Sequence, residues 1–136
     1  MTTEQHTRAT SSFVIDSWDQ QPYHEGEGVQ LARVELSKTF AGDIEGTSTA
    51  SLLMAGGSES GAYVAHERLV VRVHGRDGAF VLQHAAVAGP QGGSSSWVVV
   101  PDSGTGELRG LTGDGEITRH DDGSHTFTLD YHLGGA

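Results

Sequence analysis

The sequence has no cysteine, few basic residues and no long apolar run, and each shortage removes a class of protein. Without cysteine there is no disulfide, no thiolate nucleophile and no cysteine-bearing metal site. Only 8 lysines and arginines accompany 18 aspartates and glutamates, which gives a formal net charge of −10. Such a surface repels phosphate backbones and anionic lipid, so we expect neither a nucleic-acid partner nor a membrane partner.

The sequence predicts neither a signal peptide nor a membrane-spanning helix. No stretch approaches the ~20 apolar residues of a transmembrane helix. The N-terminal segment MTTEQHTRATSS is polar and has no apolar core of the kind that signal peptides carry. We therefore expect a cytoplasmic protein, with a disordered lead-in over residues 1–11 and a single domain over residues 12–136.

What the chain does contain is alternation between apolar and polar residues, interrupted by many of its 20 glycines. Runs such as LARVELSKTF, YVAHERLVVRV and TFTLDYHL predict strands, and the sequence GRDG over residues 75–78 predicts a hairpin turn. This pattern predicts about eight or nine strands and no helix. A meander of this size either closes into a single antiparallel β-barrel of about eight strands or folds into a sandwich, and we favour the closed barrel because it leaves no exposed sheet edges. Its interior is wide enough for packed side chains or one small ligand.

Glu67 is the most informative residue, because it interrupts an apolar row. Every second residue of its strand is Tyr63, Ala65, Glu67, Leu69 and Val71, which places a carboxylate among apolar side chains. A buried carboxylate must be paired or have a shifted pKa. It can act as a general acid, a base or a countercharge. The alternative is a buried ion pair with Arg76 or another arginine that holds the strand register.

His84 and Tyr63 complete the predicted catalytic group. His84 follows Phe80 and Leu82 in an apolar row of the next strand, within a few residues of Glu67 across the hairpin. Tyr63 shares the row of Glu67. Whether His84 or its neighbour Gln83 faces inward stays open, and a histidine with a satisfied ring in the core is the alternative.

Further residues are candidates for ligand binding. Trp18, Trp97 and Tyr131 suit the wall of an aromatic lumen, although ordinary core packing explains any single ring equally well. Ser103 and Thr105 lie in the loop PDSGTGELRG, whose amides could form an anion-binding nest or a purely structural loop. Arg76 is the last candidate. The histidines form no recognised metal motif, and His66 and Glu67 point to opposite faces, so we expect no metal and no cofactor.

Several segments, in the same order, resemble a bacterial family of unknown function. They are SWDQ, FAGDIEGTS, AYVAHERL, GRDGAFVLQHAA, VVVPDSGTGELRGLTG and LDYHL, and together they span roughly residues 12–133. That family is similar in fold to allene oxide cyclase and the dirigent proteins, which are small antiparallel barrels. Those relatives fold a reactive intermediate in an apolar lumen, with an acidic group and ordered water. The resemblance implies an allene-oxide-cyclase-like barrel.

Together, the residues and the resemblance favour a cofactor-independent isomerase or cyclase. Its substrate would be a small apolar molecule of polyketide, terpenoid or lipid type, held in the lumen with Glu67 as acid, base or countercharge. One alternative is a carrier of a small amphiphilic ligand that does no chemistry. Another is a structural barrel with a filled lumen that assembles into homo-oligomers.

Overall fold

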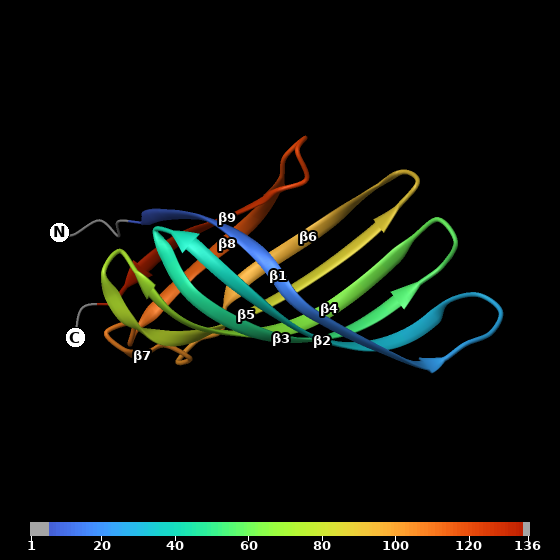
Figure 1. Cartoon of the computed structure of the whole chain (residues 1–136), viewed down its shortest axis with the longest axis horizontal. Coiled ribbons are helices and arrows are strands. Elements are labelled where there is room, and N and C mark those ends of the chain that lie inside the picture. Colours follow the sequence, from blue (N-terminus) through green and yellow to red (C-terminus); the bar gives the residue numbers. More distant parts are fainter. Residues whose placement is uncertain (1–5, 135–136) are drawn as a thin grey trace.

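The computed structural model describes residues 6–134, which form a closed antiparallel barrel of eight strands and one additional short strand, as the alternation predicted (Figure 1). No helix long and apolar enough to cross a membrane occurs among these residues. Around the barrel, the strands follow the order β1, β2, β3, β4, β5, β6, β8 and β9, and β9 pairs again with β1. The strands are β1 (Thr7–His24), β2 (Gln30–Gly42), β3 (Ile44–Gly56), β4 (Gly61–Val73), β5 (Arg76–Gly89), β6 (Gly92–Val99), β7 (Thr105–Gly106), β8 (Leu111–Arg119) and β9 (His125–Leu133).

The two ends of the barrel differ. Figure 1 shows the β1–β2, β3–β4 and β5–β6 hairpins extending to one side, where the strands spread apart; we call this the open end. The start of β1, the end of β9 and the short strand β7 lie at the other side, which we call the plugged end. Strands β6 and β8 pair at the single position Val98–Asp114, so beyond it they diverge toward the open end.

The barrel closes through the first residues of β1. Thr7 to Phe13 pair in unbroken register with Tyr131 to His125 of β9. The predicted disordered lead-in over residues 1–11 therefore needs correction from residue 7 onward, because this segment supplies the closing strand of the sheet. Residues 1–5 lie outside the described residues.

The β4–β5 hairpin turns earlier than the sequence predicted. Its two turn residues are His74 and Gly75, both at positive φ (48° and 83°), and Val73 pairs with Arg76. This is the conformation that two-residue hairpin turns favour. The predicted turn over residues 75–78 is wrong because Gly78 serves another purpose: a Cβ there would lie 2.1 Å from the carbonyl oxygen of Thr105 in β7. The glycine permits the close approach of β7, which pairs antiparallel with β5 at this position.

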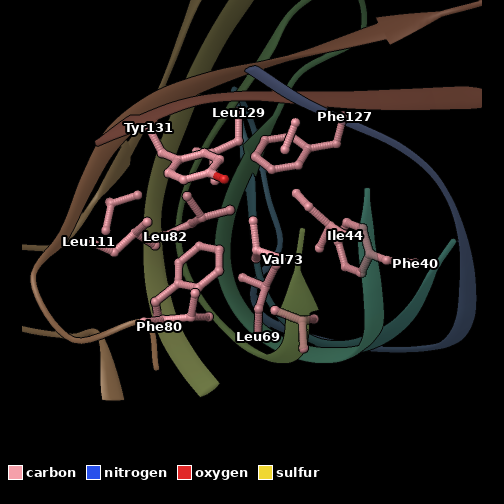
Figure 2. Packing of buried hydrophobic residues seen from close by; sticks show 14 of the residues in the cluster. Phe40, Ile44, Leu69, Val73, Phe80, Leu82, Leu111, Phe127, Leu129 and Tyr131 are labelled. Atoms are coloured by element: carbon pink, nitrogen blue, oxygen red, sulfur yellow. The ribbon is translucent and has the colours of Figure 1, made fainter. Parts of the chain in front are cut away.

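A large apolar core fills the plugged end. Figure 2 shows side chains from strands all around the barrel meeting in its interior. Leu108, in the loop after β7, is fully buried and belongs to this core. The labelled members of this core are Phe40, Ile44, Leu69, Val73, Phe80, Leu82, Leu111, Phe127, Leu129 and Tyr131.

A bulge in β1 decides what faces the open end. The pairing of β1 with β2 shifts between Ile15 and Ser17, so Trp18 rather than its neighbour lies opposite the buried Leu36. A one-residue shift moves every later side chain to the other face. The bulge therefore turns Trp18 toward the inside of the barrel mouth, where it is half-exposed.

Candidate functional site

Glu67 lies on β4 and has polar partners on the next two strands, β3 and β2. These partners explain why a carboxylate can occur in an otherwise apolar row. Its side chain is fully buried, and Oε1 accepts a hydrogen bond from Lys38 Nζ of β2 at 3.1 Å. Oε2 accepts a hydrogen bond from Ser48 Oγ of β3 at 2.6 Å. The sheet register places Lys38 opposite Ser48, and Ala50 opposite Glu67, so the inward rows of three strands bring these groups together.

The surroundings of Glu67 keep it ionised. Burial by itself would raise the pKa of this carboxyl group. The hydrogen bond from His84, the charge of Lys38 and the hydrogen bonds from Ser48 and Lys38 together outweigh burial, and the pKa lies below its ordinary value of 4.5. Because its acceptor positions face protein donors and it has no exposed surface, Glu67 does not line the cavity itself; its neighbours His84 and Lys38 do.

His84 links Glu67 to Tyr63. Its Nε2 lies 3.1 Å from Glu67 Oε1, and its Nδ1 lies 2.8 Å from the hydroxyl of Tyr63. An ionised carboxylate only accepts hydrogen bonds, so we assign the ring proton to Nε2. With this assignment, Nδ1 accepts a hydrogen bond from the Tyr63 hydroxyl group. The indole of Trp97 stacks on the His84 ring with centroids 3.6 Å apart and planes 4° apart, which fixes the ring orientation.

Tyr63 carries this chain of hydrogen bonds to the cavity. Burial and the negative charge of Glu67 raise its pKa to about 12, so the phenol is protonated at neutral pH. The order carboxylate, imidazole, hydroxyl is the arrangement by which a histidine takes a proton from a hydroxyl group while a carboxylate stabilises the resulting imidazolium.

An apolar cavity of about 200 Å³ adjoins these groups at the open end. Its polar lining residues are Lys38, Tyr63 and His84. The remaining lining residues are Phe13, Ile15, Trp18, Leu36, Ala50, Leu52, Met54, Trp97 and Ile117. The volume is below the 300–1,000 Å³ of most ligand pockets, but a second hollow of about 470 Å³, toward the loops after β1 and β3, shares Met54 with it. A larger hollow of about 610 Å³ lies on the outer side of β2–β5, among Arg33, Glu35, Val64 and Gln83.

Some of the predicted site residues meet at this cavity. Tyr63, His84, Trp18 and Trp97 line it, and the open question of parity is settled because His84 and Trp97 are buried inside while Gln83 faces outward. Glu67 lies behind the wall that they form.

The other predicted residues lie at the plugged end. Ser103 Oγ accepts a hydrogen bond from the Val81 amide, and Thr105 Oγ1 accepts one from the Ala79 amide, so this loop is fastened to β5. Tyr131 is buried there and contacts His74. Arg76 is exposed beside the β4–β5 turn, and the ion-pair partner of Glu67 is Lys38 rather than an arginine.

Sequence reasoning missed Lys38 and Ser48. The signal for Lys38 was present, because it interrupts the apolar row Ala32, Val34, Leu36 and Phe40 just as Glu67 interrupts its own. When two oppositely charged residues each interrupt an apolar row that faces the interior of one barrel, they predict a buried ion pair. Within the part of the chain that the structure describes, no three histidine, aspartate or glutamate side chains are grouped so as to hold a metal ion.

Comparison with known proteins gives a family without an assigned activity. The family described as "Protein of unknown function (DUF3224)" matches residues 9–131. A crystal structure from Shewanella oneidensis MR-1, of a protein with unknown function from the same family, is 34% identical and superposes with a TM-score of 0.85. The match covers 97% of this chain and 100% of that one. No curated protein matches the chain. The resemblance to allene oxide cyclase stays a prediction.

Proposed function

The chain belongs to the DUF3224 family, and we propose that it binds a small apolar molecule in the open end of its barrel and isomerises it by proton transfer. The observation that supports this most directly is the hydrogen-bonded series Glu67, His84 and Tyr63, which ends at the wall of an apolar cavity. A fully buried carboxylate, an imidazole and a phenol are costly to place in a barrel whose other interior residues are mostly apolar. Perturbed titratable groups in a cavity are typical of active sites.

In the proposed reaction Tyr63 is the group that exchanges protons with the substrate. A substrate C–H proton passes to the phenol oxygen while the phenol proton passes to His84 Nδ1. Glu67 holds the ring in the required tautomer and stabilises the imidazolium, and is thus a positioning residue. Return of the proton to a different carbon completes an isomerisation with no cofactor and no net change in atoms or electrons.

The cavity supplies the rest of the catalysis. Aromatic and aliphatic walls hold a flexible molecule of polyketide, terpenoid or lipid type near one conformer and exclude water from the polar groups. The divergence of β6 from β8 places Trp97 and Ile117, which both line the cavity, on two strands that do not pair beside it. A substrate that is longer than the cavity has room to extend between β6 and β8.

The experiment is a comparison of binding and proton exchange in Tyr63→Phe and in the wild-type protein. Small neutral ring compounds are screened by tryptophan fluorescence, and those that bind are incubated in D₂O while deuterium incorporation is followed by NMR. We expect Tyr63→Phe to bind the same compounds and to lose the protein-dependent exchange. Tyr23→Phe, at an exposed tyrosine outside the cavity, should retain both.

A non-catalytic carrier is the second candidate, favoured by the predominance of apolar residues in the cavity wall. It predicts that compounds bind to the wild-type protein and that none exchanges faster than in buffer. If no compound binds at the cavity, both the enzyme and the carrier are refuted, and the filled structural barrel remains.

A further inference from the structure

Lys38 lines the cavity and carries a charge, but the proton transfer proposed above does not use it. We propose that its ammonium group binds the oxygen of a neutral carbonyl compound, so that the substrate is an aldehyde or ketone with a C–H bond next to the carbonyl group. This inference rests on the proposed function, because it names the substrate class of the same cavity.

The hydrogen-bonding capacity of Lys38 is the first argument. An ammonium group carries three N–H donors. Among residues 6–134, Glu67 Oε1 is the hydrogen-bond acceptor that Nζ reaches, at 3.1 Å. Nζ otherwise lies 4.6 Å from the ring centroid of Phe13 and 5.4 Å from that of Trp97. The side chain is only 6% exposed, so water reaches it poorly, and an oxygen entering the cavity would supply an acceptor that the protein does not.

The balance of charge decides between a carbonyl group and a carboxylate. Lys38 is already neutralised by Glu67 at 3.1 Å, so this buried ion pair has no net charge. A carboxylate guest would leave one buried negative charge without a counterion, in a protein whose formal charge is −10. A carbonyl oxygen forms the charge-assisted hydrogen bond and brings no charge of its own.

The positions of Lys38 and Tyr63 connect this binding mode with the chemistry. Lys38 lies on β2 and Tyr63 on β4, and both line the cavity. A carbonyl oxygen at Lys38 can therefore accompany an adjacent C–H group directed at Tyr63. Removal of that proton leaves an enolate whose negative charge resides on the oxygen at the ammonium group. Stabilising the charge that develops during reaction is the interaction that accelerates a proton transfer most.

The first test needs only the wild-type protein and three probes of one shape. They are 2-tetralone, tetralin, which lacks the oxygen, and tetralin-2-carboxylate, and their dissociation constants are measured by tryptophan fluorescence at constant ionic strength. We expect 2-tetralone to bind roughly tenfold tighter than tetralin, the factor that one hydrogen bond to a charged group contributes. Equal binding of 2-tetralone and tetralin, or tighter binding of the carboxylate, would overturn the inference, as would binding of none of the three.

Variants then assign the preference to Lys38. Lys38→Met should abolish the preference for 2-tetralone over tetralin. If Lys38→Met alone does not fold, the double variant Lys38→Met/Glu67→Gln leaves no unpaired buried charge and serves the same purpose. Arg33→Met, at an exposed residue outside the cavity, is the control and should retain the preference. A preference that survives the loss of Lys38 in a folded variant contradicts the inference.

Deuterium exchange at the carbon next to the carbonyl group of 2-tetralone separates this inference from the proposed function. If 2-tetralone and tetralin bind equally but exchange still depends on Tyr63, the proposed function stands and the Lys38 inference falls. If the preference depends on Lys38 and no exchange above that in buffer occurs, the oxygen site is supported and the catalytic proposal falls.

Discussion

Replacing Glu67 by glutamine tests the central physical claim, that a buried ion pair organises the site. The change keeps the shape of the side chain and removes its charge. It leaves the ammonium group of Lys38, whose side chain is 6% exposed, without a counterion. Removing one partner of a buried pair destabilises proteins by about 3–5 kcal/mol. The glutamine amide can still accept a hydrogen bond from Lys38 and donate one to Ser48, so we expect the lower limit, about 3 kcal/mol.

The companion variants isolate the pairwise interaction. Lys38→Met leaves the opposite charge unpaired and should cost a similar amount. The double variant Lys38→Met/Glu67→Gln has no buried charge and should be destabilised by less than the sum of the two single variants, giving an interaction energy of about 2 kcal/mol or more. Glu35→Gln is the matched control, since Glu35 also accepts a serine hydrogen bond (2.8 Å from Ser51) but is exposed. It should change stability by less than ~0.5 kcal/mol.

The assay is urea unfolding at pH 7, followed by tryptophan fluorescence. Trp18→Phe serves as the common background, so that Trp97, which stacks on His84, is the single reporter. The slope with urea should be the same in all variants, because the surface exposed on unfolding is nearly unchanged. A loss of unfolding free energy below about 1 kcal/mol in Glu67→Gln would refute a strong buried ion pair. So would a double variant whose loss equals the sum of the losses in the two single variants.

Three further outcomes follow from the same contacts. The pKa of Glu67 is lower in the folded chain than its ordinary 4.5, so the stability that the ionised Glu67 contributes is complete above pH 4.5 and is lost as the pH falls through the folded-state pKa. Between pH 5 and pH 2 the wild-type protein should therefore lose more unfolding free energy than Glu67→Gln. Parallel curves of unfolding free energy against pH for the two proteins would contradict this. Ser48→Ala removes the 2.6 Å hydrogen bond to Glu67 and should cost about 1–3 kcal/mol in urea unfolding, whereas Ser51→Ala on the exposed face should cost little; equal effects would argue against the assigned role. Leu108→Ala should cost about 2–5 kcal/mol because it leaves a cavity beneath the plugged end, yet the affinity for 2-tetralone should stay unchanged, and a large loss of affinity would show that the two ends are not independent.

The interior rows of the barrel were predictable because alternation is a local property. From Ala32 to Phe40 in β2 and from Tyr63 to Val73 in β4 every second residue is apolar, with the exceptions Lys38 and Glu67, which both prove to be buried. Glu67 and His84 could be placed near each other from the sequence, since a short hairpin leaves few registers. Their hydrogen bond and that of Tyr63 to His84 agree with this expectation.

Long-range register was beyond the sequence. The Asp77–Gly78 pair has the composition of a turn, but Gly78 is required by the close pairing of β7 with β5, and the turn lies at His74–Gly75. Likewise the bulge after Ile15 has no distinctive residue, yet it determines that Trp18 faces the cavity. Ser103 and Thr105 appeared suited to a ligand, and the fold uses their hydroxyl groups to fasten a loop to β5.

The sequence alone was sufficient to predict an all-β fold without cysteine chemistry and with a carboxylate in its interior, because strand propensity, alternation and charge composition need no knowledge of distant contacts. Only the tertiary structure determined that the carboxylate is neutralised by Lys38 rather than by an arginine, and that His84 and Tyr63 extend it to a cavity at one end. These relations depend on which strands are neighbours and in what register. Register is set by bulges, turns and crossings summed over the whole closed sheet, and no single segment contains that information.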